Sequence, residues 1–168
     1  MKQTVFAMIA AADSAGTAYV GDYSSQLTLE KMDYSNSSEA ISFSLEHYYN
    51  SGLAGGNFGE VSAYTKDYSS MKIGNGWKLN AQQTIVEKKI GSTIYYIYTD
   101  GDGTVIYFYQ DDDGVYRDEL GKGLKVELDI NNCMYVIDKN QFEYGFYPSG
   151  NLYEYCDASR NIVYIEWD

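Results

Sequence analysis

TIYYIYTDGDGTVIYFYQ, residues 93–110, is the stretch that decides the fold. It holds two runs of alternating side chains, 93–99 and 104–110, on either side of the joint Asp100-Gly101-Asp102-Gly103. A side-chain period of two indicates a β-strand. Glycine accepts the positive φ that tight hairpin turns require. The stretch therefore predicts a tyrosine-rich antiparallel β-hairpin.

The same alternation continues toward the C-terminus, with short joints rich in glycine, asparagine and aspartate between the runs. The predicted strands of this part cover residues 82–90, 93–99, 104–110, 115–117, 124–129, 133–138, 141–147, 151–157 and 162–167. Successive strands joined by short turns pair as an antiparallel meander. We therefore expect an all-β fold, a meander of short hairpins that forms an open, twisted and curved sheet.

The N-terminal half is less regular. Residues 26–32 and 40–49 alternate and predict a pair of strands, with a polar turn at 33–38 between them and a long loop at 50–75. The start of the chain, one lysine followed by a short apolar run, fits a weak signal-peptide outline, a short helix or a strand. We divide the chain into an N-terminal segment (1–22), an N-terminal β region (23–80) and a hairpin array (81–168).

Composition excludes several classes of protein. The net charge is −12, from 12 Lys and Arg against 24 Asp and Glu, and this argues against nucleic acid as a partner because such binding relies on basic side chains. No apolar run reaches the ~20 residues that a membrane-spanning helix needs. The two cysteines, Cys133 and Cys156, are too few for a disulfide scaffold, and whether they pair is left open. The 19 tyrosines suit a sheet with one partly wet face.

Two groups of motifs resemble those of the YD-repeat (RHS) family. Upstream lie a YNS, an FG and a GxGW element, and downstream lies a glycine turn followed by x-Leu, alternating aromatics and Asp-x-x-x-Asn. Arg160 stands where the family usually has glycine, and Cys156 separates Tyr155 from Asp157. The residues that carry the resemblance are Tyr49, Asn50, Ser51, Phe58, Gly59, Gly74, Gly76, Trp77, Gly150, Leu152, Asp157 and Asn161.

The resemblance implies a fold and a role. YD repeats build long β-sheets that curl into shells or surfaces of large secreted and envelope proteins. The resemblance implies that this chain is a non-catalytic wall element of an incomplete shell, in a bacterial secreted or envelope protein. The implied partners are further YD repeats or another β-edge, and cell-surface polysaccharide where the family is linked to adhesion.

The residues offer little catalytic chemistry, so we expect no enzyme and no cofactor. His47 is the single histidine and no G-x-S-x-G element accompanies it. One histidine and two distant cysteines cannot supply a structural transition-metal site. The acidic turns 100–103 and 111–114 suggest either calcium or capping of their own backbone, and capping is the favoured interpretation because the EF-hand spacing fails.

The aromatic side chains leave two interpretations. Trp77, Tyr107 and Tyr109 are the candidates to face a ligand, because sugar rings stack on exposed aromatics. Cross-strand packing is the ordinary use of aromatic residues on strands and is the favoured interpretation. The alternative function is therefore a carbohydrate-binding or adhesion module.

Overall fold

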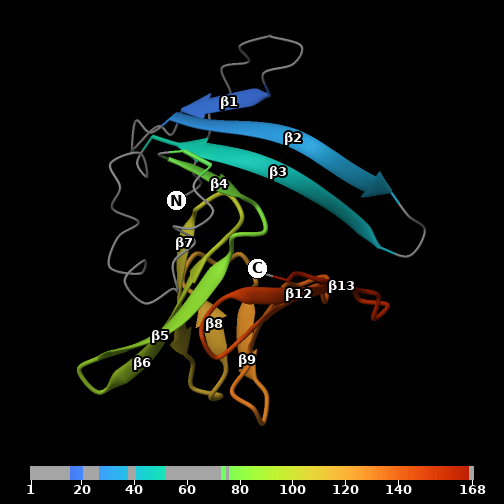
Figure 1. The fold of residues 1–168 in the computed structure, drawn as a ribbon. Coiled ribbons are helices and arrows are strands. Elements are labelled where there is room, and N and C mark those ends of the chain that lie inside the picture. The colour runs from blue at the N-terminus through green and yellow to red at the C-terminus, as the bar shows by residue number, and fades with distance from the viewer. Residues whose placement is uncertain (1–15, 21–26, 38–40, 52–72, 75, 167–168) are drawn as a thin grey trace.

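The computed structural model describes residues 16–20, 27–37, 41–51, 73–74 and 76–166. All regular secondary structure in these residues is β, thirteen strands in two antiparallel sheets (Figure 1). The predicted all-β fold of antiparallel hairpins in an open, curved sheet is confirmed. The described part contains no helix long and apolar enough to cross a membrane.

The smaller sheet has four strands in sequence order. These are β1 (Thr17–Val20), β2 (Leu27–Ser37), β3 (Ser42–Asn50) and β4 (Trp77–Leu79). The predicted pairing of residues 26–32 with 40–49 is confirmed, since β2 and β3 are hydrogen-bonded neighbours.

The predicted turn at 33–38 is wrong, because β2 continues to Ser37, which pairs with Ser42. The register shifts between Met32 and Tyr34, so Asp33 forms a β-bulge that takes up the extra polar residue. The strand tolerates its polar sequence here because the end of β2 is exposed.

The larger sheet, which we call the array, has nine strands that also follow sequence order. They are β5 (Thr84–Ile90), β6 (Thr93–Thr99), β7 (Val105–Gln110), β8 (Tyr116–Asp118), β9 (Lys125–Leu128), β10 (Met134–Ile137), β11 (Glu143–Phe146), β12 (Leu152–Cys156) and β13 (Ile162–Tyr164). Each predicted strand of the array is present, with ends that differ by a few residues.

The array curls into a half-barrel around one hydrophobic core. Alternate side chains of its strands point inward, and Phe108, Phe146 and Ile85 are completely buried. Tyr96 and Tyr98 lie in the same cluster. Each directs its hydroxyl to a partner, Tyr96 to Glu87 at 3.1 Å and Tyr98 to Gln83 at 2.5 Å. Cross-strand packing is thus confirmed as the role of these inner tyrosines.

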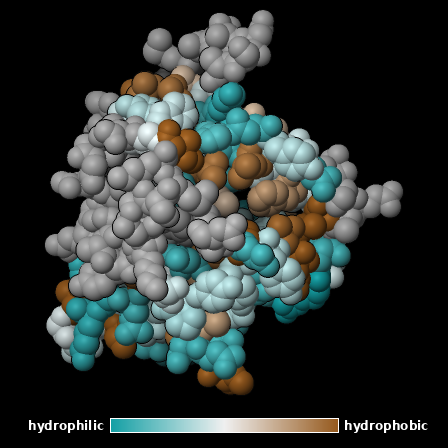
Figure 2. Space-filling model, viewed as in Figure 1, coloured by the Kyte–Doolittle hydropathy of each residue, from teal (hydrophilic) through white to brown (hydrophobic). Residues whose placement is uncertain are grey.

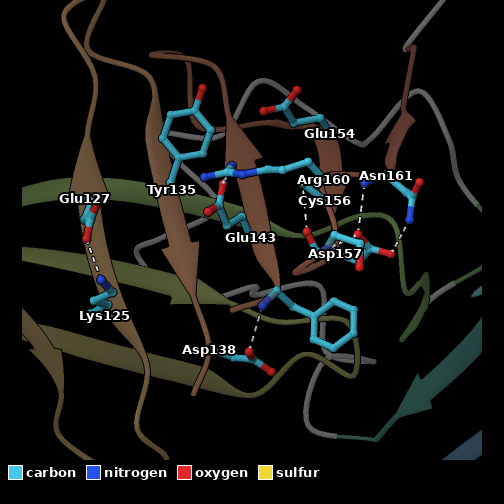
Figure 3. A network of polar contacts seen from close by, with 12 residues as sticks. Lys125, Glu127, Tyr135, Asp138, Glu143, Glu154, Cys156, Asp157, Arg160 and Asn161 are labelled. Atoms are coloured by element: carbon cyan, nitrogen blue, oxygen red, sulfur yellow. Dashed lines mark hydrogen bonds and ion pairs between the residues drawn. The ribbon is translucent and has the colours of Figure 1, made fainter. Parts of the chain in front are cut away.

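One hydrogen-bonded loop recurs between the strands of the array. It begins at an aspartate whose Oδ1 accepts the backbone N–H groups two and four residues further on, at 2.7–3.2 Å. Figure 3 shows two of these carboxylates with their bonds. The loop aspartates are Asp100, Asp111, Asp129, Asp138 and Asp157. The prediction that turn aspartates cap their own backbone is confirmed.

The fourth residue of each loop has positive φ. Glycine occupies this position in two loops, at Gly103 and Gly114, whereas Asn132, Gln141 and Arg160 occupy it in the others, with φ of 61–65°. Arg160 therefore adopts the backbone conformation that glycine favours. The aspartate bonds hold that conformation in place.

The half-barrel is fastened where β5 meets the β11–β12 turn. Gly150 has φ of 93°, and its carbonyl accepts the Ile85 N–H at 3.0 Å. Thr84 and Asn151 form a further antiparallel bridge. A Cβ added at Gly150 would lie 2.4 Å from the Ile85 carbonyl oxygen. Only glycine allows this close backbone approach.

Gly150→Ala is therefore expected to destabilise the protein much more than Gly91→Ala. Both glycines have positive φ, which costs a side-chain-bearing residue about 1–2 kcal/mol. At Gly91 a Cβ would meet nothing within 4 Å, whereas at Gly150 the contact with β5 must also open. The free energy of unfolding in urea measures the difference, and equal losses in the two variants would refute the close-approach argument.

Candidate functional site

The upstream motif residues come together at the end of β3. The Asn50 N–H donates to the Gly76 carbonyl at 2.9 Å, and the Trp77 N–H donates to the Gly74 carbonyl at 3.1 Å. Tyr49 and Trp77 are register partners whose ring centroids lie 5.3 Å apart. The YNS and GxGW elements, distant in sequence, thus form one joint between β3 and β4. Phe58 and Gly59 lie outside the described residues.

Both glycines of the GxGW element have positive φ, 143° at Gly74 and 81° at Gly76. A Cβ at Gly74 would lie 3.2 Å from Cδ1 of Trp77, so the indole fills the space beside it. The Ser51 hydroxyl accepts a hydrogen bond from the Leu27 N–H at 2.9 Å. The described YNS and GxGW residues therefore hold the backbone of the four-stranded sheet.

The downstream motif residues also hold backbone. Gly150 fastens the half-barrel, and Leu152 is buried in the core with 2 % of its surface exposed. Asp157 caps the β12–β13 loop, and its Oδ2 accepts the Asn161 side-chain amide at 2.9 Å. Hydrogen bonds, chiefly from Asn161, hold the pKa of Asp157 below its ordinary value.

The three candidate ligand-facing aromatics do not form one site. Trp77 is half-buried against Tyr49 in the four-stranded sheet. Tyr107 and Tyr109 lie on β7 of the array, on the face opposite Ile106 and Phe108 of the core, and are 37 % and 46 % exposed. Only the two tyrosines remain available as a pair.

A buried polar corner joins the two sheets. Five polar or charged residues are buried in the described part, and Lys78, Gln82, Gln83 and Thr84 all lie where β4 leads into β5. The Leu79 N–H donates to the Gln82 side chain at 2.7 Å, and the Asn80 side chain bonds backbone of β3 through Ser44 and Glu46. Buried polar groups are costly unless they are hydrogen-bonded, and these have partners.

Lys78 connects this corner to the array. It follows the motif residue Trp77, is 4 % exposed, and its Nζ donates to the backbone carbonyl of Asp100 in the β6–β7 turn. Lys122 from the β8–β9 loop lies 3.8 Å from the Asp100 carboxylate. Two lysines thus approach the DGDG turn, one of them from the other sheet. The ammonium of Lys78 supplies a positive charge beside the acidic turn for which the sequence raised calcium as an alternative.

Burial dominates the electrostatics of this corner. Burial raises the pKa of Asp100 to about 7, helped by its hydrogen bond and repulsion with Asp102. Burial also lowers the pKa of Lys78 to about 8, against the attraction of both aspartates. Burial raises the pKa of Asp102 too, but hydrogen bonds from Asp100 and Thr104 outweigh it and the net shift is downward. Removing the two charges from water costs more than their attraction returns.

A cavity of about 150 Å³ lies beside the corner, lined by Phe43, Asn80, Gln83, Tyr144, Tyr155 and Ile165 among others. In the space-filling view, hydrophobic surface gathers around a hollow between the four-stranded sheet and the β12–β13 end of the array (Figure 2). Burial raises the pKa of Tyr144 to about 12. The two sheets therefore meet through a part-polar, incompletely filled contact rather than a continuous apolar core.

Other chemical groups are sparse. The Nδ1 atom of His47 contacts the Asp33 carboxylate in the β2 bulge. Within the described residues, no hydroxyl group is hydrogen-bonded to its Nε2 atom. No group of three or more His, Cys, Asp or Glu that could hold a metal occurs in the described part. Cys133 and Cys156 are both free thiols. The corner at Lys78 brings a buried lysine beside two aspartates with shifted pKa values, and its geometry favours mechanical joining of the two sheets.

Sequence reasoning missed Lys78. The sequence did contain a related signal, the DGDG turn. Its two neighbouring carboxylates are stabilised by a nearby cation or by sharing a proton. The identity of that cation follows only from the sheet arrangement, which brings residue 78 against residue 100. A lysine inside an alternating run is otherwise expected to be exposed.

Asp100→Asn is expected to flatten the pH dependence of stability between about pH 4 and 7. With a raised pKa, folded Asp100 keeps a proton that the unfolded chain has released, so stability falls as pH rises through this window, by at most about 1.4 kcal/mol per pH unit. Lys78 has a lowered pKa, so its contribution makes stability rise with pH above about 8. Urea unfolding across pH 4.5–10 measures both limbs.

Asp111→Asn is the matched control, because Asp111 caps the same kind of loop at the surface. Hydrogen bonds, above all the one from Arg117, lower the pKa of Asp111. Replacing Asp111 is therefore expected to leave the pH dependence of stability between about pH 4.5 and 7 unchanged. Equal profiles for wild type and Asp100→Asn would refute the argument from buried charge.

Comparisons with known proteins give no relative for this fold or this corner. No family model, curated protein or solved structure matches the chain.

Proposed function

We propose that the chain is a non-catalytic wall element of a β-shell, as its resemblance to YD repeats implies. The observation that carries the proposal is the repetition of one aspartate loop between strands that follow strict sequence order. Such an array serves as a surface or a partition. On the same resemblance we propose a secreted or envelope location in a bacterium.

Repetition supports a structural role because the hairpins are interchangeable in form. Each array strand is hydrogen-bonded only to its neighbours in sequence, apart from the Thr84–Asn151 bridge that fastens the curl. In repeat architectures of this kind, stability grows by adding neighbour contacts. The wall can therefore be lengthened without redesign of a closed core.

The acidic charge fits a wall better than a reaction centre. The aspartate loops place carboxylates at both ends of the strands, where they cap backbone and are partly exposed to solvent. A solvated acidic rim favours solubility and discourages non-specific association.

A second candidate, carbohydrate binding, rests on the exposed pair Tyr107 and Tyr109. Tyr109 is a register partner of Tyr95 on β6 and of Arg117 on β8, so aromatic and cationic side chains adjoin on this face. Flat aromatics beside a hydrogen-bond donor suit sugar rings. The wall proposal does not require such a ligand.

The two candidates differ in what Tyr107→Ala and Tyr109→Ala do. The wall proposal expects no glycan signal on an array of bacterial and host polysaccharides, and a change of about 1 kcal/mol or less in unfolding free energy for these exposed positions. Trp77→Ala, which removes the ring packed on Tyr49, serves as the comparison and is expected to cost about 3 kcal/mol. Sugar binding that disappears in the tyrosine variants while the fold melts normally would favour the carbohydrate candidate.

The wall proposal predicts that the array accepts an extra hairpin. Residues 139–157 run from one loop aspartate to the next, so a second copy inserted directly after Asp157 preserves the aspartate joint on both sides. The inserted strands are expected to gain hydrogen-exchange protection, and the urea m value is expected to rise with the extra buried surface. A Gly-Ser insert of equal length is the control. Unprotected exchange throughout the inserted copy would contradict the proposal.

A further inference from the structure

The two outer strands of the array differ in how their free edges are protected. At β5, Thr84 and Ile85 are engaged by the β11–β12 turn, and the rest of the strand carries Glu87, Lys88 and Lys89. At β13 the sequence Ile162-Val163-Tyr164-Ile165 carries no charge. Charged residues on an edge discourage pairing with another strand, and β13 lacks them.

The hydrogen bonds of β13 fix which of its backbone groups are free. The Asp157 N–H donates to Asn161 at 3.0 Å, and the Ile165 N–H donates to Tyr153 at 2.8 Å. Val163, the register partner of Tyr155, lies two residues from both Asn161 and Ile165 along the strand. Its backbone groups therefore face β12, as theirs do. In an antiparallel pair the bonding residues alternate. The backbone groups of Ile162 and Tyr164 therefore point away from β12, toward the open edge.

The side chains on this edge are exposed as well. Ile162 is 42 % and Tyr164 67 % exposed, whereas Ile165 packs against the core cluster of the array. Among the described residues, nothing pairs with the outward donors and acceptors of the strand or covers its outer apolar surface. This is the combination by which sheets recruit another strand.

We propose that β13 pairs with β13 of a second copy of this chain, antiparallel about a twofold axis at Val163. In this register Ile162 lies opposite the partner's Tyr164, and Tyr164 opposite the partner's Ile162. Both pairs are hydrogen-bonded pairs, each exchanging two N–H···O bonds, because these residues carry the outward groups. The two arrays then form one continuous sheet.

Charge supports an antiparallel partner strand of the same sequence. Arg160 lies in the loop before β13 and Glu166 lies just after it, so antiparallel pairing brings the Arg160 end of each copy toward the Glu166 end of the other. Both are exposed, with 72 % of the Arg160 side chain accessible although it also bonds Glu143 at 2.7 Å (Figure 3). The inference deepens the proposed wall role, on whose open edge it rests.

Cysteine cross-linking tests the register. In a Cys133→Ser background, Val163→Cys is expected to form an intermolecular disulfide on mild oxidation, because Val163 would face its own copy in a non-hydrogen-bonded pair, where Cβ atoms lie closest. Tyr164→Cys is the matched variant and is expected to cross-link at least tenfold more slowly. Faster cross-linking at Tyr164 would overturn the proposed axis.

Sedimentation equilibrium tests the pairing itself. The full chain is expected to show a concentration-dependent monomer–dimer equilibrium, and Tyr164→Pro, which removes an outward N–H, is expected to weaken it at least tenfold with unchanged unfolding. Val163→Pro is the comparison, because it removes a group that faces β12 and is expected to lower stability instead. Arg160→Glu is expected to weaken the dimer and Arg160→Glu with Glu166→Arg to restore it.

A wild-type chain that stays monomeric at all concentrations would overturn the pairing. Acceptance of the inserted hairpin would still support the wall in that case. Unprotected inserted strands together with a dimer would overturn the wall and leave the pairing intact. The two experiments therefore fail separately.

Discussion

The hydrogen bonds that two backbone N–H groups of each loop donate to the loop's aspartate carboxylate are the interaction on which the array depends. They hold a positive φ at the fourth loop residue even where that residue is asparagine, glutamine or arginine. A fixed loop sets the register of the next strand, and a slip of one residue would turn its buried side chains to solvent. The core of Phe108, Val136 and Phe146 is thus assembled one loop at a time.

The polar corner obeys a different constraint. Lys78 and Asp100 are withdrawn from water where the two sheets meet, and burial is the largest cause of the upward shift in the pKa of Asp100 and of the downward shift in the pKa of Lys78. The Lys78 ammonium donates to the backbone carbonyl of Asp100, so replacing Lys78 would leave that carbonyl without this partner. The corner therefore defines how the four-stranded sheet is attached, at a cost to stability that the core of the array must offset.

The fold was predictable from sequence because its determinants are local. Residues 93–110 contain both the alternation of β6 and β7 and the aspartate loop between them, and the same holds for later hairpins. The predicted turn at 33–38 failed because a bulge at Asp33 preserves strand pairing through a polar segment. Lys78 could not be found because its partner belongs to another sheet, and no period or motif encodes that contact. The meeting of the YNS and GxGW elements is likewise a tertiary fact.

The two outer strands of the array, β5 and β13, differ in the contacts that hold them. Its first strand is fastened by Gly150, a contact far apart in sequence, and bears charges along the remaining edge. Within the described residues its last strand is paired only with β12, and the two residues whose backbone groups face outward, Ile162 and Tyr164, are uncharged. In the proposed pairing, strand addition at β13 would extend the array without disturbing the contact between β5 and the β11–β12 turn.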